Sequence, residues 1–222
     1  MSKSPHLYRI LSYRHVIKMF ADRELYFASP RSWDDPYEKA LVHKYSDALF
    51  AQCWCKKAVS DAMWRIYSTD RTSLRIQTTR HQLKKTLTAA QGTEKFDFLI
   101  EDVQYKTAKL VDAHISQIAK DLRIEYNVRR AEDALLVKRD AFDHEEEVRV
   151  IVHDQTATDA VERSGFKVRI DPHELIDSIY FDPRADDAFM DLCRNYIECS
   201  IGFKGKIGKS ALYRLREPEV VK

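Results

Sequence analysis

Residues 143–154 read DHEEEVRVIVHD, and this stretch decides the fold class. Its second half is rich in valine and isoleucine and has neither the caps nor the period of a helix, so we predict a strand. Side chains alternate in direction along a strand. We therefore expect Glu145, Glu147 and Arg149 on one face, and Glu146 with the valines at 148, 150 and 152 on the other. The charged face is either a solvated ladder of surface charge or one wall of a pocket.

Length and composition favour one domain over residues 1–222. A chain of 222 residues with 44% hydrophobic side chains can bury a sizeable core. Five glycines and six prolines, with no repeat and no low-complexity stretch, leave no segment typical of a linker. The balance of 37 basic against 35 acidic residues neither demands nor excludes a nucleic-acid partner.

The sequence indicates a cytoplasmic location without a membrane partner. The opening residues MSKSPHLYRI lack the apolar run of a signal peptide, and no eighteen apolar residues follow one another. The cysteines form C-x-C and C-x5-C pairs, at 53 and 55 and at 193 and 199, and the histidines show no H-x3-H spacing. Zinc ribbons use C-x2-C pairs, so we expect reduced thiols and no metal site.

Outward from the opening stretch, strands and helices are mixed without strict alternation. Helices are expected over 12–23 with Ser12 as cap, after Ser60, and over 185–198, and residues 107–138 are mostly helical without clear interruptions. Strands are expected at 7–10, 24–28, 50–55, 72–78, 99–105, 166–170, 177–181 and 211–216. This order predicts an α+β fold with a mixed or antiparallel sheet core and flanking helices.

Two further segments predict loops. Residues 29–38, SPRSWDDPYE, hold two prolines and an Asp pair. Residues 202–210, GFKGKIGKS, do not match a phosphate-binding loop, because five residues separate Gly202 from Gly208 where that motif has four. Its lysines at 204, 206 and 209 indicate a basic surface loop, with a grip on phosphates as the alternative.

Taken in order, these pieces resemble a bacterial family, the domain of unknown function 2971. That family shows a tyrosine-bearing first strand, a loop S-P-x-x-F-N-D-P-F-E, a cysteine-containing strand, M-W-x-x-Y, a Lys, W-x-x-E-x-E-x-R and I-x-x-I-x-x-G-P-R. The counterparts here are LYRI, SPRSWDDPYE, FAQCWC, MWRIY, Lys138, FDHEEEVR and LIDSIYFDPR. The resemblance extends from Tyr8 to Arg184, and the combination is specific although each motif alone is weak.

This sequence departs from the family pattern at four positions. Trp33 stands for the loop Phe, Asp34 for the usual Asn and Phe142 for the usual Trp, and all three keep shape or hydrogen bonding. Asp182 stands where Gly is common, which questions a tight turn after that strand and leaves the charged face untouched.

The layout in turn resembles that of bacterial ADP-ribosyltransferases, in which a late strand offers a Glu to the nicotinamide ribose. The resemblance implies NAD as substrate, an acceptor that is a protein or a nucleic acid, and a bacterial toxin or phage-defence effector whose neutralising partner protein stays open. It implies that Glu147 stabilises the oxocarbenium charge, that Glu145 orients the ribose or the acceptor, and that Arg149 keeps Glu147 ionised or meets a phosphate. The implied cofactor-binding residues are Tyr8, Arg9, Asp35, Trp64, Tyr67 and Ser68.

Two alternatives stay open. A metal-dependent nuclease would use Asp140 or Asp35 with Glu145, Glu147 and Lys138 around Mg²⁺. A non-catalytic nucleic-acid or protein-binding module would use the basic C-terminal loop, and its carboxylates would be a surface ladder. A requirement for NAD or for a divalent metal distinguishes the two enzymes.

Overall fold

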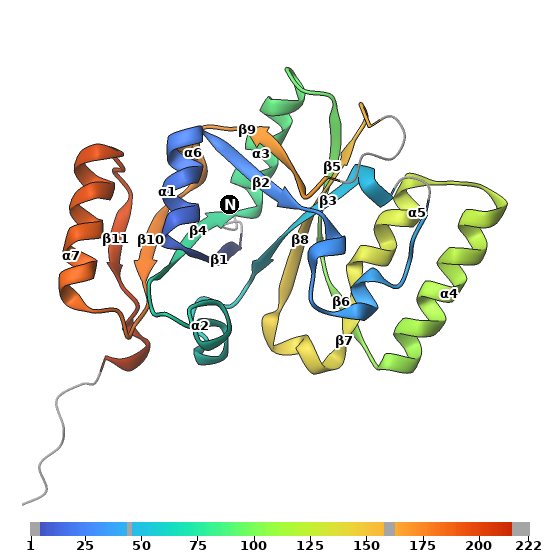
Figure 1. Ribbon diagram of the computed structural model, residues 1–222, viewed down its shortest axis with the longest axis horizontal. Helices are drawn as coiled ribbons and strands as arrows, with labels where there is room; N and C mark the ends of the chain where they lie inside the picture. The colour runs from blue at the N-terminus through green and yellow to red at the C-terminus, as the bar shows by residue number, and fades with distance from the viewer. Residues whose placement is uncertain (1–4, 44–45, 158–162, 215–222) are drawn as a thin grey trace, which may run out of the picture.

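A strongly branched sheet organises the molecule, as the computed structural model of the chain shows for residues 5–43, 46–157 and 163–214. Figure 1 shows its strands running across the molecule, with α4 and α5 beside one end and α7 beside the other. The strands of this sheet are β1 (His6–Ser12), β2 (Glu24–Ala28), β3 (Leu49–Cys55), β4 (Ser73–Thr79), β5 (Phe96–Asp102), β8 (Glu147–Asp154), β9 (Gly165–Arg169), β10 (Ser178–Phe181) and β11 (Lys206–Lys209).

The strand order explains the branching. One path runs β11-β10-β4-β1-β3-β2-β9, and β8 and β5 continue from β3 off this path. Only the β10–β11 pair is parallel among the pairs of this sheet in the described residues. A small parallel pair, β6 (Gln104–Lys106) with β7 (Val137–Arg139), lies apart from it.

The described residues contain seven α-helices and several short 3-10 helices. The α-helices are α1 (Tyr13–Asp22), α2 (Asp61–Tyr67), α3 (Arg80–Gln91), α4 (Ala108–Ile124), α5 (Val128–Asp133), α6 (Pro172–Leu175) and α7 (Asp187–Asn195), which a π-helical turn (Tyr196–Ser200) extends. Short 3-10 helices span Pro30–Ser32, Pro36–Lys39, Ser46–Ala48, Ala134–Leu136, Asp140–Glu145 and Ala211–Tyr213. Among the described residues, no helix combines the length and the apolar character needed to cross a membrane.

Two apolar clusters explain why β8 is buried along almost its whole length. The larger cluster joins Val148 and Val150 to Trp54 of β3 and to α1 and α3, whereas Ile151 on the other face joins β3, β5 and the segment around Leu135. A strand covered on both faces is a near-continuous apolar run. The described residues thus form one α+β domain with a mixed sheet, as the sequence predicted.

Several local predictions need correction. Strand β8 begins at Glu147, because Glu145 lies in a 3-10 helix and Glu146 adopts a left-handed conformation with φ 41°. The sequence had suggested that the pleat of one strand aligns Glu145 with Glu147. This prediction is wrong, because Glu145 precedes the strand. The predicted strand 99–105 is two strands broken at Val103, and the run 107–138 divides into α4, α5, a 3-10 helix and β7.

The C-terminal predictions also change. Residues 206–209 form β11, which pairs with β10, so the basic loop is in part an edge strand. Within the predicted strand 211–216, Ala211–Tyr213 is a 3-10 helix, and residues 215–216 lie outside the described residues. Ser12 and Ser60 cap their helices as expected, because their hydroxyls accept from the N–H groups of His15 and Met63.

Candidate active site

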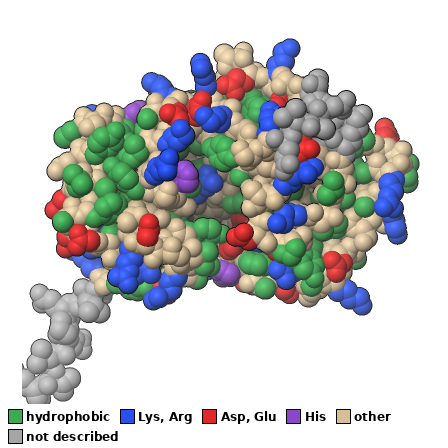
Figure 2. Space-filling view, viewed as in Figure 1, with side chains coloured by type: hydrophobic (Ala, Val, Ile, Leu, Met, Phe, Trp, Pro, Cys, Tyr) green, Lys and Arg blue, Asp and Glu red, His purple; other side chains and the backbone are tan. Residues whose placement is uncertain are grey.

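A cleft opens where β3 changes partners. One edge of β3 pairs with β8 throughout, whereas its other edge meets β1 at Tyr8–Cys55 and β2 at Ala28–Ala51. Strands β1 and β2 diverge there, and a cavity of about 680 Å³ lies between them, α2 and the segment that leads into β8. Small-molecule sites measure roughly 300–1,000 Å³. Figure 2 shows a hollow near the middle of the face that it displays.

Glu147 lies at the inner wall of this cavity. Its carboxylate receives hydrogen bonds from Arg149 Nε at 2.6 Å and Nη2 at 3.1 Å, and from Lys138 Nζ at 3.4 Å. Burial on its own raises the pKa of Glu147, but Arg149 and then Lys138 outweigh burial, and the net pKa lies below the ordinary value of 4.5. Glu147 is therefore an ionised carboxylate at neutral pH, although it is only 3% exposed.

Arg149 is fully engaged in holding this wall together. Beside its two bonds to Glu147, its Nη1 donates to the Leu135 carbonyl at 2.6 Å and its Nη2 donates to Glu38. The indole of Trp33 covers the guanidinium at 4.4 Å. Burial lowers the pKa of Arg149, but Glu147 and Glu38 raise it well above its ordinary value. Protein acceptors thus engage all three nitrogens of the guanidinium.

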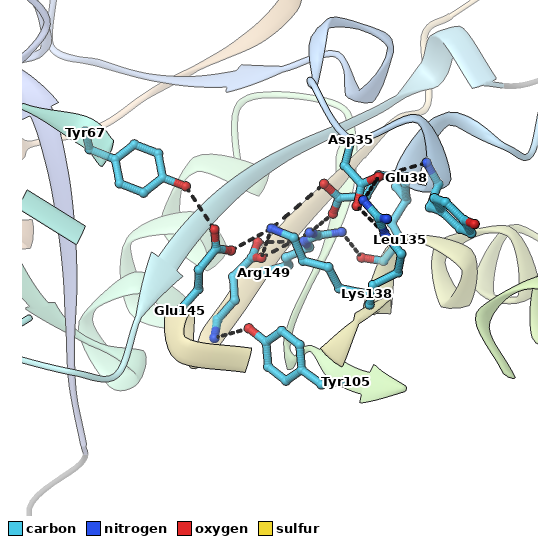
Figure 3. A network of polar contacts seen from close by, with 11 residues as sticks. Asp35, Glu38, Tyr67, Tyr105, Leu135, Lys138, Glu145 and Arg149 are labelled. Carbon is cyan, nitrogen blue, oxygen red and sulfur yellow. Dashed lines mark hydrogen bonds and ion pairs between the residues drawn. The ribbon is translucent and has the colours of Figure 1, made fainter. Parts of the chain in front are cut away.

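Lys138 joins the two glutamates of the motif. Its Nζ donates to Glu145 at 2.6 Å, and Figure 3 shows the Glu145 carboxylate between this ammonium and the hydroxyl of Tyr67. Tyr67 donates to Glu145 at 3.4 Å and keeps 45% of its surface exposed. Burial lowers the pKa of Lys138, but Glu147, Glu38 and Glu145 more than offset it, so the net pKa is raised. Glu145 thus connects the buried cluster to the surface.

The buried cluster holds more carboxylates than cations. Three carboxylates, Glu38, Glu145 and Glu147, surround two cations, Lys138 and Arg149. With all five ionised, the cluster carries one excess negative charge. Burial raises the pKa of Glu38 above its ordinary value, although Arg149 and Lys138 lower it. Each of the five side chains is at most 8% exposed. Because water screens such a site poorly, the excess charge acts strongly on a ligand in the cavity.

The 29–38 segment brings its own acid to this wall. Asp35 accepts from the Tyr37 N–H at 3.0 Å, which caps the Pro36–Lys39 helix, and pairs with Arg139 Nη2 at 3.0 Å. Asp35 lines the cavity, and its bonds place Glu38 one turn later against Arg149. Within residues 29–38, Glu38 is therefore the main contact with the buried cluster.

Two supporting groups, Tyr105 and Cys53, were not among the expected site residues, although Cys53 lies in the cysteine-containing strand of the family motif. The hydroxyl of Tyr105 accepts from the Glu147 N–H at 2.9 Å, and the Cys53 thiol hydrogen-bonds to the Glu147 side chain. Burial raises the pKa of both Cys53 and Tyr105, so both stay neutral. Glu38 was likewise missed as a site residue, although its place in the loop motif next to Asp35 offered a signal.

The opposite wall, on β1 and β4, carries cations without carboxylate partners. Arg9 is partly buried and lines the cavity, and no described residue forms an ion pair with it. Burial lowers the pKa of Arg9 to about 10, so the guanidinium stays charged at neutral pH. The cavity thus lies between an anionic and a cationic wall.

The remaining expected binding residues occupy different depths. Tyr8 and Trp64 line the cavity, but Trp64 is 1% exposed and contributes mainly shape. Ser68 is also 1% exposed and does not line the cavity, because its hydroxyl bonds to Asp182 and to the Ser73 N–H. The structure therefore brings Tyr8, Arg9, Asp35, Tyr67, Glu145, Glu147 and Arg149 around one space.

The carboxylates expected of a nuclease are differently arranged. Glu145 and Glu147 are bridged by Lys138, Asp35 pairs with Arg139, and Asp140 is exposed and does not line the cavity. Across the described ranges, no three His, Cys, Asp or Glu side chains are grouped so as to hold a metal ion. A divalent cation bound by both Glu145 and Glu147 would compete with Lys138.

Comparison with known proteins gives a family model and distant structures. No curated protein matches the chain. A Thermus sp. 2.9 DarT structure in complex with NAD⁺ shares 11% identity, covering 94% of this chain and 96% of that chain, with a TM-score of 0.44. A structure of the same protein in complex with ADP-ribosylated ssDNA shares 10% identity over 94% of this chain and 95% of that chain, with a TM-score of 0.45.

The family model covers four of the five side chains of the buried cluster, all except Glu38. Residues 63–150 match the model described as "Protein of unknown function (DUF2971)". This segment contains Trp64, Tyr67, Lys138, Glu145 and Glu147. The resemblance of the chain to the domain of unknown function 2971 is thereby confirmed over residues 63–150.

Proposed function

We propose that the chain is an NAD-utilising ADP-ribosyltransferase-like enzyme. The observation that carries the proposal is the cavity between a buried, net-negative carboxylate cluster and the unpaired guanidinium of Arg9. NAD has matching features, because positive charge develops on its nicotinamide ribose during bond cleavage and its diphosphate is negative. A ligand with these two ends fits a cleft with two walls of opposite charge.

The anionic wall is suited to the bond that breaks. When the nicotinamide–ribose bond breaks, its electron pair leaves with nicotinamide and the ribose carbon becomes cationic. Glu147 is ionised and fixed by Arg149, Lys138 and Cys53, so it needs little reorganisation to stabilise that charge. Its lowered pKa makes it a weak base, which favours an electrostatic role over proton removal.

Glu145 is the better candidate for the acceptor side. The acceptor forms a bond to the ribose carbon and loses a proton, which a nearby base must take. Glu145 is 6% exposed, touches the exposed Tyr67 at the mouth of the cleft and shares Lys138 with Glu147. We assign it the orientation and deprotonation of the acceptor, while the Tyr67 ring stacks on nicotinamide or adenine.

The binding of the diphosphate falls to Arg9. A guanidinium without a protein carboxylate has its donors available for phosphate oxygens, and Arg9 lines the cavity. Tyr8 and Trp64 shape the same wall. Ser68 would act through the position of α2, because its hydroxyl is bonded on the side away from the cavity.

The decisive test compares two adjacent glutamates. Glu147→Gln keeps the shape but removes the charge, and we expect nicotinamide release to fall about 10²–10³-fold. Glu146→Gln is the matched control, because Glu146 is exposed and pairs with Lys57 at the surface. Purified protein is incubated with labelled NAD and cell lysate, and released nicotinamide and label on protein and nucleic acid are measured.

Parallel incubations with EDTA separate the alternatives. Release that persists in EDTA and is lost in Glu147→Gln but not in Glu146→Gln supports the transferase. Nucleic-acid cleavage that needs Mg²⁺ would support the nuclease instead. No NAD binding by calorimetry and no activity in either assay would leave the cluster with a structural role.

A further inference from the structure

Arg75 is a second cation without an acceptor, and the proposed chemistry does not use it. It lies on β4, is 7% exposed and lines the cleft. Its Nε and Nη1 atoms are enclosed and have no hydrogen-bond partner among the described residues. The hydroxyl of Ser178, on the neighbouring strand β10, is also buried without a partner. Buried donors without acceptors are rare, and an unidentified ligand is one explanation.

Arg75 belongs to a row of alternating rings and cations that crosses four strands. The row, here called the ring–cation row, consists of Tyr8 on β1, Arg75 on β4, Tyr180 on β10 and Lys206 on β11. The Arg75 guanidinium lies 5.2 Å from the Tyr8 ring and 4.9 Å from the Tyr180 ring, and Lys206 Nζ lies 5.8 Å from the Tyr180 ring. Figure 1 shows these strands following one another from the centre of the molecule to the β11 edge.

The register places these side chains on one face of the sheet. Arg75 stands opposite Tyr180, and Ser178 stands opposite both Gln77 and Lys206. Opposed residues point to the same side, as do residues two apart on a strand. Neighbouring strands lie about 4.8 Å apart, so four strands extend roughly 14 Å.

The row extends beyond the cleft. Tyr8 and Arg75 line the cavity, whereas Tyr180 and Lys206 lie outside its lining. At its inner end, Tyr8 stands opposite Cys55, which in turn stands opposite Glu147. A ligand that contacts the whole row must therefore extend from the sheet edge to Tyr8, two strands from Glu147, and lies partly outside the cavity.

We propose that the ring–cation row binds a single-stranded polynucleotide and leads it to the cleft. Single-strand-binding proteins combine aromatic platforms for bases with cations for the phosphate backbone. The row offers both in alternation, and its guanidinium has donors to spare. That this strand is the acceptor of ADP-ribose rests on the function proposed above, whereas its binding does not.

Direct binding tests the row without NAD. Fluorescein-labelled single-stranded oligothymidylate and oligouridylate, each of about a dozen nucleotides on the scale of one single-strand site, are titrated with the full chain at several salt concentrations. For Lys206→Ala we expect roughly threefold to tenfold weaker binding and a salt slope smaller by about 1. For Arg75→Gln we expect a loss of about tenfold or more, because the variant removes a charge and both ring contacts.

Lys209 provides the matched control. It lies on the same strand, three residues from Lys206 and hence on the other face, and it pairs with Asp187 at 2.9 Å. Lys209→Ala should bind both oligonucleotides like the unmodified chain. Because Lys206 and Lys209 are surface residues, neither variant is expected to disturb folding, even if Arg75→Gln does.

Calorimetry with NAD alone distinguishes the two sources of phosphate. Weaker oligonucleotide binding by Lys206→Ala with unchanged NAD affinity supports the row. Arg75→Gln that loses NAD but keeps oligonucleotide affinity would assign Arg75 to the dinucleotide and overturn the proposal. Equal binding by Lys206→Ala and Lys209→Ala, or no binding by the unmodified chain, would also overturn it. Oligonucleotide binding that depends on Lys206 in a protein without nicotinamide release would refute the proposed enzyme alone.

Discussion

The two walls of the cleft differ in how completely their charges are paired. On the β8 wall, Glu147 and Arg149 bond to each other and to further partners, and both are almost fully buried. On the β1–β4 wall, Arg9 and Arg75 have no carboxylate partner among the described residues. The comparison indicates that the first wall is preorganised by the protein, whereas the second keeps donors that the protein does not use.

The difference has an origin in the fold. Strand β8 lies between β3 and β5 with apolar clusters on both faces, so any charge on it must be neutralised by the protein. On β1 and β4, Arg75 stands opposite Ile10, whereas Arg9 stands opposite the core residue Ile76, so the two guanidinium groups leave these strands on different faces. Both nevertheless line the cavity, where solvent or a ligand can meet a cation that the protein does not pair.

Removing Arg149 should produce the largest effect on stability. Arg149→Met leaves Glu147 and Glu38 buried with Lys138 as their remaining cation, and breaking a buried pair in this way costs about 3–5 kcal/mol. Urea unfolding measures the change. Lys57→Ala, which breaks the exposed pair with Glu146, should cost less than about 1 kcal/mol. Similar losses in the two variants would contradict the contrast between buried and surface pairs.

Acid should remove the stability that ionised Glu147 contributes, and this loss should be smaller than that caused by Arg149→Met. The folded pKa of Glu147 lies below its ordinary value of 4.5, so the unfolded chain takes up the proton first as the pH falls. The stability from Glu147 is thus complete above about pH 4.5 and is lost as the pH falls through the folded pKa. As the pH is lowered, the urea midpoint of unfolding should fall less steeply in Glu147→Gln than in the unmodified chain. A steeper fall would refute the assignment.

Removing a cation from the β1–β4 wall should change the free energy of unfolding least, and any change should be an increase. Arg9→Met and Arg75→Met remove cations that the protein does not pair, and burial lowers the pKa of both, which means that folding disfavours their charge. We expect unfolding free energies that are unchanged or higher by up to about 1 kcal/mol, as at other sites where function costs stability. Thermal and urea unfolding test this. A loss above about 2 kcal/mol would show that these residues hold the fold together.

Local patterns predicted much of the fold. The β-branched run after Glu147 and the capping serines concern neighbours in the chain, and the structure confirms them. The segment 29–38, predicted as a loop, contains two short 3-10 helices. The pleat rule failed for Glu145, because a 3-10 helix and the left-handed Glu146 precede the strand. Lys138, seven residues before Glu145, still links Glu145 to Glu147, because its ammonium group donates to both carboxylates.

The amino-acid sequence by itself determined the α+β class and the strand that carries Glu147 and Arg149, because short-range sterics and alternation act within a few residues. Alternation did not predict the surface position of Glu146, which it placed on the face of the valines; Glu146 precedes the strand in a left-handed conformation. Only the tertiary structure decided which charges are paired. Glu38 reaches Arg149 across 111 positions of the chain, and Arg75 meets Tyr180 through strand register. Pairing depends on distance and burial in the folded chain, and neither quantity is encoded in the spacing of the residues along the sequence.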